Sequence, residues 1–316
     1  DDNTEIIFED VKKNYSADIN VYSEYKFSFH NDEPATGRFF LRIRPKTTAG
    51  IADDESKTIY QAYSSDKYIY KPIRDEILDD AEAAFLFNTI KVPYETNDYL
   101  RNEIQLLKSS DLLTIIQESF TKITKELPGP DTKIIILPAS SLNRPALEKI
   151  KLPISGITLG SGKIILSIDP TYQNWTDFLP YCIAHEYHHS TWCSRNWISA
   201  DFSLIEYLVF EGRADLFASE QYKTVSNPLT NFLTREQETE VWELIKNEIF
   251  GKGHDRINGV MFGTDKIPFG SGYNIGFNIV RLFKERNPAT NTLDLMDMNP
   301  NEIFERSGYE DYKAQK

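Results

Sequence analysis

The sequence predicts an α+β protein that is mostly helical, with a small mixed sheet and a β-rich segment at its N-terminus. Residues 1–75 contain stretches that alternate aromatic and polar side chains, which is the period of a half-buried strand. After residue 75, apolar side chains recur mainly at helical spacing, interrupted by short apolar runs of strand length. We therefore predict a β-rich accessory segment, residues 1–75, followed by one larger domain, residues 76–316.

The elements of the first half follow from these patterns. Tyr25–His30 alternates like a strand and could form a hairpin with Phe39–Arg44. Helical spacing after residue 75 predicts three helices, and Ser110 is the expected N-cap of the third, which the Pro-Gly-Pro sequence at 128–130 ends. The expected elements of this half also include a strand within Ile59–Tyr70 and helices over Asp75–Ile90, Tyr99–Leu107 and Ser110–Leu127.

The second half alternates strands and helices and then becomes helical. Thr234 and Gln237 form the sequence of a capping box, and Gly308 is placed to stop the last helix. The residues between Gly251 and Gly272 are rich in glycine, which predicts an irregular stretch. The expected elements are strands at Lys133–Pro138 and on both sides of Gly160–Gly162, and helices at Asn143–Ile150, Asn174–Cys193, Ser203–Tyr222, Thr234–Phe250, Tyr273–Glu285 and Asn299–Ser307.

The composition excludes several classes of partner. The 316 residues carry a net charge of −13 and contain no long basic run, so neither nucleic acid nor an anionic membrane surface is expected as a partner. The chain also lacks an apolar run near the roughly eighteen residues that a transmembrane helix requires. The composition predicts no particular oligomeric state.

The start of the chain and its cysteines bear on the compartment. The chain begins at Asp1 and its first methionine is Met261, so we expect a trimmed N-terminus. An exported or envelope-attached protein that has lost a signal segment is the favoured interpretation, and a cytoplasmic protein is the alternative. Cys182 and Cys193, if carried by one helix, lie about 16 Å apart, which is too far for a disulfide.

The chemistry of the chain centres on His185-Glu186-x-x-His189 in the predicted helix 174–193. Residues four apart share one face of a helix, so both imidazoles can bind one metal ion. The intervening Glu186 then lies close to the ion and can act as a general base. This spacing is the signature of zinc hydrolases. The neighbouring His188 points about 100° away around the helix, so we interpret it as a supporting or core residue.

A catalytic zinc ion takes three protein ligands and leaves a fourth position for water. The next predicted helix carries Glu211-Gly212-Arg213-Ala214-Asp215 after an apolar run that indicates burial. Glu211 is therefore the expected third ligand. Asp215, on the same face, can accept the N–H of a ligand histidine and fix its tautomer. Gly212 is expected to let two helices approach beside the ion, and Arg213 is interpreted as a surface charge.

These motifs resemble those of the gluzincin metallopeptidases, the thermolysin-like class of zinc peptidases. Together with Met261-Phe262-Gly263 and the Gly272–Val280 stretch, they are more closely similar to a family of bacterial predicted zinc-dependent proteases still named for unknown function. The resemblance covers residues 133–283. It implies a zincin-like catalytic domain, a zinc cofactor and a peptide or protein substrate. It also implies that Lys163–Ile168 is the sheet edge to which an extended peptide adds.

The implied reaction is zinc-assisted hydrolysis of peptide bonds with Glu186 as general base. The oxyanion needs a further donor, for which Tyr273 is the first candidate and His254 the second. Two alternatives stay open. The protein could hydrolyse a non-peptide amide or ester, or it could bind zinc structurally and engage a partner through its N-terminal β-rich segment without catalysis.

Overall fold

The computed structural model describes residues 4–10, 15–18, 39–45, 57–61, 98–139, 152–196 and 202–314. The strand predicted at Tyr25–His30 and the helices predicted at Asp75–Ile90 and Asn143–Ile150 lie outside these residues. The chain divides into two compact units, residues 1–194 and 195–316, which are described one at a time. The division predicted after residue 75 and the accessory role of the preceding segment stay predictions.

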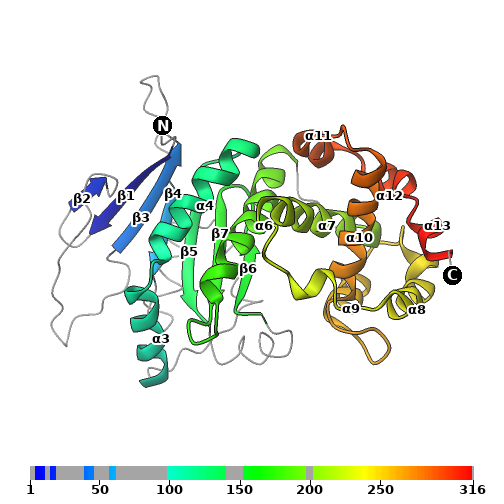
Figure 1. Ribbon diagram of the computed structural model, residues 1–316, viewed down its shortest axis with the longest axis horizontal. Coiled ribbons are helices and arrows are strands. Elements are labelled where there is room, and N and C mark those ends of the chain that lie inside the picture. The colour runs from blue at the N-terminus through cyan, green and yellow to red at the C-terminus, as the bar shows by residue number, and fades with distance from the viewer. Residues whose placement is uncertain are drawn as a thin grey trace. The chain divides into compact units, whose positions relative to one another are not determined.

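The first unit contains a mixed sheet of seven strands in the order β2-β1-β3-β4-β5-β7-β6 (Figure 1). The pairs β4–β5 and β5–β7 are parallel, and the remaining pairs are antiparallel. Together with the helices, this sheet makes the chain an α+β protein. The strands are β1 (Thr4–Asp10), β2 (Tyr15–Asp18), β3 (Phe39–Pro45), β4 (Lys57–Gln61), β5 (Lys133–Pro138), β6 (Ile154–Thr158) and β7 (Lys163–Ile168).

Among the described strands, β2 and β6 form the two edges of the sheet, so the prediction that Lys163–Ile168 (β7) forms an edge was wrong. β7 lies between β5 and β6 and is hydrogen-bonded to both. Gly160 and Gly162 have φ angles of 100° and 71°, which let the chain reverse tightly between β6 and β7. The consecutive apolar residues of β7 are buried, as expected for a strand covered on both faces.

Three helices of the first unit are described: α3 (Asp98–Ser109), α4 (Leu112–Glu126) and α6 (Trp175–Arg195). All three were predicted, but the expected cap of α4 was wrong. Asp111 occupies the N-cap position without a side-chain cap hydrogen bond, and the Ser110 hydroxyl instead donates to the Leu107 carbonyl at 2.7 Å. Ser110 therefore closes the end of α3 rather than opening α4.

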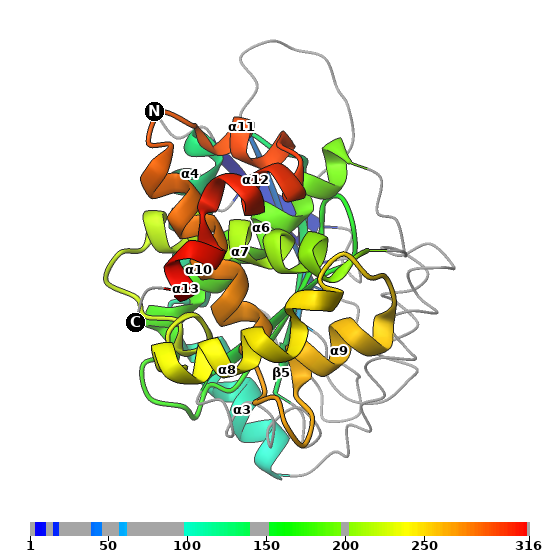
Figure 2. The same cartoon turned by 90° about the vertical axis from the view of Figure 1, so that its right-hand side faces the viewer.

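The second unit is built from helices (Figure 2). The expected capping box of Thr234 and Gln237 is present, and Ser203 forms a second one with Glu206 at the start of α7, which the sequence analysis did not predict. The elements are α7 (Leu204–Gln221), η2 (Pro228–Thr230), α8 (Arg235–Ile245), η3 (Lys246–Glu248), α9 (His254–Phe262), α10 (Ser271–Arg286), α11 (Thr292–Asp297), α12 (Pro300–Ser307) and α13 (Tyr309–Ala314).

Two predictions for this unit were wrong. The Gly251–Gly272 stretch contains the helix α9, because Ile257, Val260 and Met261 at helical spacing are buried in the core. The helix ending before Gly308 is not the last one. Gly308 takes the left-handed conformation that ends α12, as expected, and α13 follows directly.

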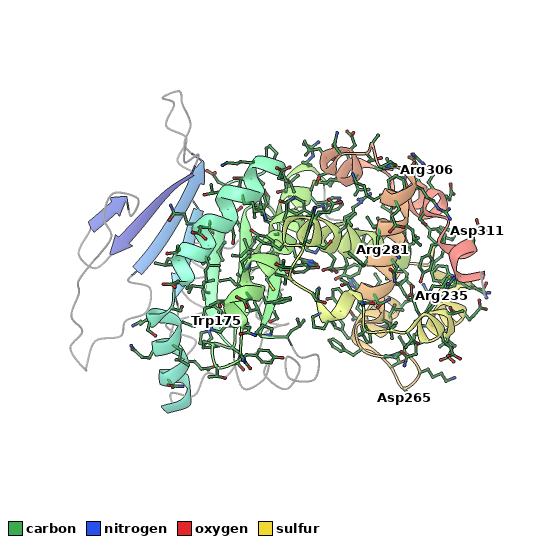
Figure 3. All side chains as sticks on the ribbon, in the orientation of Figure 1. Trp175, Arg235, Asp265, Arg281, Arg306 and Asp311 are labelled. Atoms are coloured by element: carbon green, nitrogen blue, oxygen red, sulfur yellow. The ribbon has the colours of Figure 1, made fainter. Side chains whose placement is uncertain are left out.

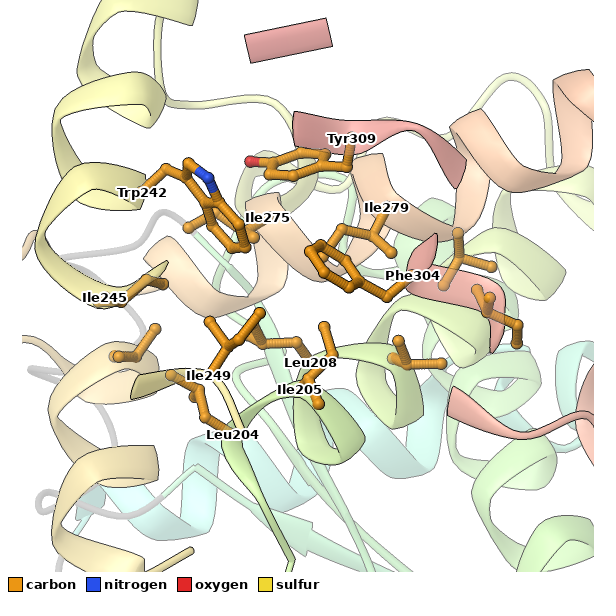
Figure 4. Close-up of a cluster of buried hydrophobic side chains, with 14 of the residues drawn as sticks. Leu204, Ile205, Leu208, Trp242, Ile245, Ile249, Ile275, Ile279, Phe304 and Tyr309 are labelled. Atoms are coloured by element: carbon orange, nitrogen blue, oxygen red, sulfur yellow. The ribbon is translucent and has the colours of Figure 1, made fainter. Parts of the chain in front are cut away.

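The core of the second unit forms where α10 packs against α7. Trp242 of α8 and Tyr309 of α13 close this core, with ring centroids 4.9 Å apart in an edge-on arrangement (Figure 4). Burial of such large aromatic side chains contributes about 2–3 kcal/mol each. The C-terminal helix is therefore part of the hydrophobic core of this unit.

Charged side chains lie on the outside of the second unit, among them Arg281, Arg306 and Asp311 (Figure 3). Arg306 pairs with Glu302 one turn earlier at 2.6 Å, and both side chains remain about half exposed. None of the helices in the described ranges has both the length and the apolar character needed to cross a bilayer.

Candidate metal centre

The motif helix α6 is fixed to the β6–β7 hairpin by polar contacts. The Thr158 hydroxyl lies 2.9 Å from the Glu186 carbonyl oxygen and 2.7 Å from its carboxylate Oε2. One helical turn further on, the Gly162 N–H donates to the Ser190 hydroxyl at 2.7 Å. These contacts place the central turns of α6, which carry the His-Glu-x-x-His motif, against the edge of the sheet.

Tyr187 of α6 packs against α4 and Gly129. Its ring meets Phe120 of α4 edge-on, with centroids 5.4 Å apart. Gly129 lies so close that a Cβ there would be 2.7 Å from the Tyr187 hydroxyl and 2.2 Å from Oγ1 of Thr191. Burial raises the pKa of Tyr187 well above its usual range, so this phenol stays protonated.

The two motif histidines converge, as their spacing predicts. Their Nε2 atoms lie 3.0 Å apart, and their rings are nearly perpendicular with centroids 4.6 Å apart. Two nitrogens that bind one zinc ion tetrahedrally at about 2.0–2.1 Å would be separated by about 3.3 Å. The pair is therefore close to the separation that a shared ion requires. His189 is buried and His185 is partly exposed.

Glu186, which stands between these histidines in the sequence, is buried, with 6% of its surface exposed. Its carboxylate lies against β6, where Gly156 leaves room for it. A Cβ at Gly156 would lie 2.4 Å from Oε1 of Glu186, so any side chain there would displace the carboxylate. Among the residues that the structure describes, Thr158 supplies the one side-chain hydrogen bond to Glu186.

Helix α7 carries the predicted third ligand in a buried segment, where Glu211, Arg213 and Asp215 all have little exposed surface. Asp215 accepts a hydrogen bond from the Asn227 amide at 3.0 Å. Arg213 is not the surface charge that was predicted, because it donates to the carbonyls of Met296 and Met298. Burial lowers the pKa of Arg213 to about 10, and the charge of Asp297 opposes this shift.

Gly212 lets two helices approach, as predicted, and these helices are α7 and α10. A Cβ on Gly212 would lie 2.2 Å from the Gly276 carbonyl oxygen, and a Cβ on Gly276 would lie 2.2 Å from the Leu208 carbonyl oxygen. The two glycines therefore allow the backbones of α7 and α10 to pack in direct contact. This packing fixes the turn of α7 that carries Glu211.

His185, His189 and Glu211 form a group whose ligand atoms all lie within 4.8 Å of one another. Two imidazoles and one carboxylate are a donor set of catalytic zinc sites, which leave a position open for water. Two of the three residues are buried, so a bound cation would be partly shielded from solvent. The residues present fit a zinc ion by donor type and by mutual distance.

The other residues considered from the sequence occupy separate places. Tyr273 lies in the first turn of α10, partly buried against the helical core, and His254 is the exposed first residue of α9. His188 is buried, in agreement with a supporting or core residue. Neither Cys182 nor Cys193 forms a disulfide, as their spacing on one helix predicts.

Comparison with known proteins identifies the family. The family model described as Predicted Zn-dependent protease (DUF2268) matches residues 112–305, which is more than half of the chain. The chain belongs to this family. The match spans the motif helix, α7 and the helices from α8 to α11, and the resemblance to this family of predicted zinc-dependent proteases is confirmed.

A relative from the curated proteins extends the comparison. The chain is 24% identical over 253 residues to the uncharacterized protein YjaZ of Bacillus subtilis (strain 168). The alignment covers 77% of this chain and 89% of that protein. No solved structure matches the chain significantly.

Sequence reasoning missed the residues of β6 that hold Glu186. Gly156 and Thr158 are two apart in a strand, so they lie on the same face of the sheet. The sequence signal for these residues is a glycine and a small hydroxyl residue two positions apart, in the hairpin before the motif helix. The residues alone did not reveal that this face of the strand meets α6.

Proposed function

We propose that the protein is a zinc metallopeptidase of the gluzincin type. The observation that carries this proposal is the convergence of the ligand atoms of His185, His189 and Glu211, together with the burial of Glu186 in the same motif. Family membership supports the same reaction class. When bound, a zinc ion supplies Lewis-acid polarisation of the scissile carbonyl and lowers the pKa of a coordinated water.

Residues of the chain would bind the ion and transfer the proton. His185, His189 and Glu211 hold the ion, and Glu186 accepts a proton from the attacking water and delivers it to the leaving amine. Burial of Glu186 beside β6 supports this role, because the carboxylate is largely shielded from bulk water. Asp215 would fix the tautomer of a ligand histidine from the next turn of α7.

The edge strand β6 suggests how a peptide would bind. An extended chain pairing with β6 would lie about 4.8 Å from it, in line with the sheet. Gly156 and Thr158 of this strand contact Glu186, so such a peptide would pass close to the general base. Because such pairing uses backbone hydrogen bonds and few side-chain contacts, we expect the site to accept peptides of many sequences.

A second donor would stabilise the oxyanion. Tyr273 stays the first candidate, because it opens α10, the helix packed directly on the segment that carries Glu211. His254 stays the second candidate and is exposed at the start of α9. A comparison of Tyr273→Phe with His254→Ala separates them, since loss of the true donor lowers kcat by about 10²–10³-fold.

The decisive experiment is a peptide-library digest combined with zinc analysis of wild type and Glu186→Gln. We expect one zinc per chain in both proteins, and cleavage by the wild type alone. Cleavage by Glu186→Gln would contradict the assignment of the base. Zinc binding without peptide cleavage in the wild type would favour one of the two alternatives, which simple amide and ester substrates then distinguish from a non-catalytic interaction protein.

A further inference from the structure

The edge strand β6 holds the carboxylate of Glu186 in a recess made by two of its residues. Gly156 and Thr158 project from the same face of the strand, because successive residues alternate between faces. The Thr158 hydroxyl contacts Oε2 of Glu186 at 2.7 Å. The other carboxylate oxygen, Oε1, lies beside Gly156, where a Cβ would be 2.4 Å away.

The recess fits the whole end of the Glu186 side chain. A Cβ at Gly156 would also lie 2.5 Å from Cγ and 2.6 Å from Cδ of Glu186, so the conformation depends on the absence of a side chain. Such distances are well inside van der Waals contact, and even alanine would force the carboxylate to move. Gly156 therefore makes the space, and Thr158 selects the orientation within it.

The hydroxyl of Thr158 carries a single proton and faces two acceptors of one residue. These are Oε2 of Glu186, at 2.7 Å, and its backbone carbonyl, at 2.9 Å. Donation to Oε2 leaves the lone pairs of Oε1 available to a water molecule. A general base needs this kind of fixed geometry, because misplacement by about 1 Å can cost about 10²-fold in rate.

We propose that Thr158 is a positioning residue that sets the Glu186 carboxylate for proton transfer, with Gly156 providing the required space. This inference rests on the proposed function of Glu186 as general base. Because Thr158 belongs to the edge strand, one element fixes both the base and the backbone against which an extended peptide would pair. The same strand would therefore fix the position of the base relative to the scissile bond.

The test compares Thr158→Val, which keeps the shape and removes the hydroxyl, with Thr158→Ser, which keeps the hydroxyl. We expect kcat for a cleaved peptide to fall about 10–100-fold in Thr158→Val, with KM and zinc content within about twofold of wild type. Thr158→Ser should recover kcat to within about threefold. A Thr158→Val enzyme with wild-type kcat, or a Thr158→Ser enzyme as impaired as Thr158→Val, would overturn the proposal.

Crystal structures of the zinc-free variants provide a readout that does not depend on activity. We expect the Glu186 carboxylate to keep its place in Thr158→Ser and to leave it in Thr158→Val and Gly156→Ala. An unchanged carboxylate in Thr158→Val would overturn the positioning role even if kcat fell. If wild type binds zinc but cleaves no peptide, the proposed function fails, and the crystal structures still decide whether Thr158 orients Glu186.

A double-mutant comparison tests whether Thr158 acts through Glu186. In a Glu186→Gln background, the Thr158→Val change should lower the residual hydrolysis by less than about threefold, because the base that it orients is gone. An additive 10–100-fold loss in the double variant would instead show that Thr158 acts on the reaction by another route, and would overturn the proposal.

Discussion

Glu186 of the first unit and Glu238 of the second are both buried, and the two carboxylates are held in different ways. Glu186 in the first unit has 6% of its surface exposed and receives one neutral hydroxyl, that of Thr158. Glu238 in the second unit has 3% exposed and receives three donors. These are the Tyr309 hydroxyl at 2.5 Å, the Lys313 ammonium at 2.9 Å and the Asn278 amide at 3.1 Å.

This difference in partners distinguishes a carboxylate that can accept a proton in catalysis from one that stabilises the fold. The two oxygens of Glu238 are used by partners from α10 and α13, one of them positively charged, so its charge is compensated. Among the described residues, the carboxylate of Glu186 accepts a hydrogen bond only at Oε2, so Oε1 keeps acceptor capacity in a residue that lies between the two motif histidines in the sequence. A buried carboxylate with spare acceptor capacity next to metal ligands can take up a proton, whereas a fully paired carboxylate cannot do so without breaking its pairs.

We expect the largest loss of hydrolysis when the proposed zinc site loses a ligand. In His189→Ala, zinc content should fall well below one per chain and peptide hydrolysis should drop about 10⁴-fold or more, since a zinc hydrolase relies on the ion for its activated water. Metal analysis and a peptide assay measure both effects. The matched control is His254→Ala, which should keep its zinc, and full hydrolysis by zinc-free His189→Ala would contradict the metal assignment.

The charge of Glu186 also acts on a neighbouring thiol. Burial first, and the negative charge of Glu186 second, raise the pKa of Cys193 to about 12. Because the thiolate is the reactive form, alkylation of native Cys193 at pH 8 should be about 10³-fold slower than that of a free thiol. With a raised pKa, the thiolate fraction keeps growing as pH rises through 9 and 10.

A Cys182→Ser variant leaves Cys193 as the sole cysteine and allows its alkylation rate to be followed against pH. We expect no plateau below pH 10, and a modest increase in rate in Glu186→Gln, where one of the two causes is removed. A rate that levels off near pH 9 would show that Cys193 is neither buried nor influenced by Glu186 as described.

Removal of the paired carboxylate should affect stability and leave the chemistry intact. Glu238→Gln leaves the Lys313 ammonium without its counter-charge, and we expect a loss of about 2–4 kcal/mol in the free energy of unfolding. Tyr309→Phe removes a single neutral donor and should cost about 1–2 kcal/mol. Chemical denaturation measures both, and kcat at a temperature where the variants are folded should stay within about twofold of wild type.

The smallest effect is expected at an exposed ion pair of the same unit. Arg306 and Glu302 are one helical turn apart and about half exposed, so Arg306→Ala should change the free energy of unfolding by less than about 1 kcal/mol. The same denaturation experiment provides the comparison with Glu238→Gln. A loss at Arg306 as large as that at Glu238 would mean that burial does not explain the difference between the two pairs.

Local signals in the sequence predicted much of the fold. The capping box at Thr234, the left-handed stop at Gly308 and the apolar runs of β5 and β7 each depend on residues close in the chain, and the structure contains all of them. The α9 helix was missed because nearby glycines masked a short apolar stripe. In the metal centre, His185 and His189 follow from helical spacing alone.

The part of the site that the sequence did not predict depends on contacts between segments that are distant in the chain. Thr158 and Glu186 are 28 residues apart, and their contact requires both the reversal at Gly160–Gly162 and the face of β6 that α6 covers. The burial of Arg213 depends in the same way on carbonyls more than 80 residues further along the chain. A single sequence carries no local pattern for such pairs, because tertiary packing decides which charges are buried.

The most direct test measures peptide hydrolysis and thermal unfolding of Glu186→Gln and Glu238→Gln side by side. We predict opposite results. Glu186→Gln should lose hydrolysis by about 10²–10⁴-fold with its zinc and melting temperature retained, whereas Glu238→Gln should melt several degrees lower with hydrolysis retained. Retained hydrolysis in zinc-loaded Glu186→Gln would contradict the assignment of this carboxylate as the catalytic base.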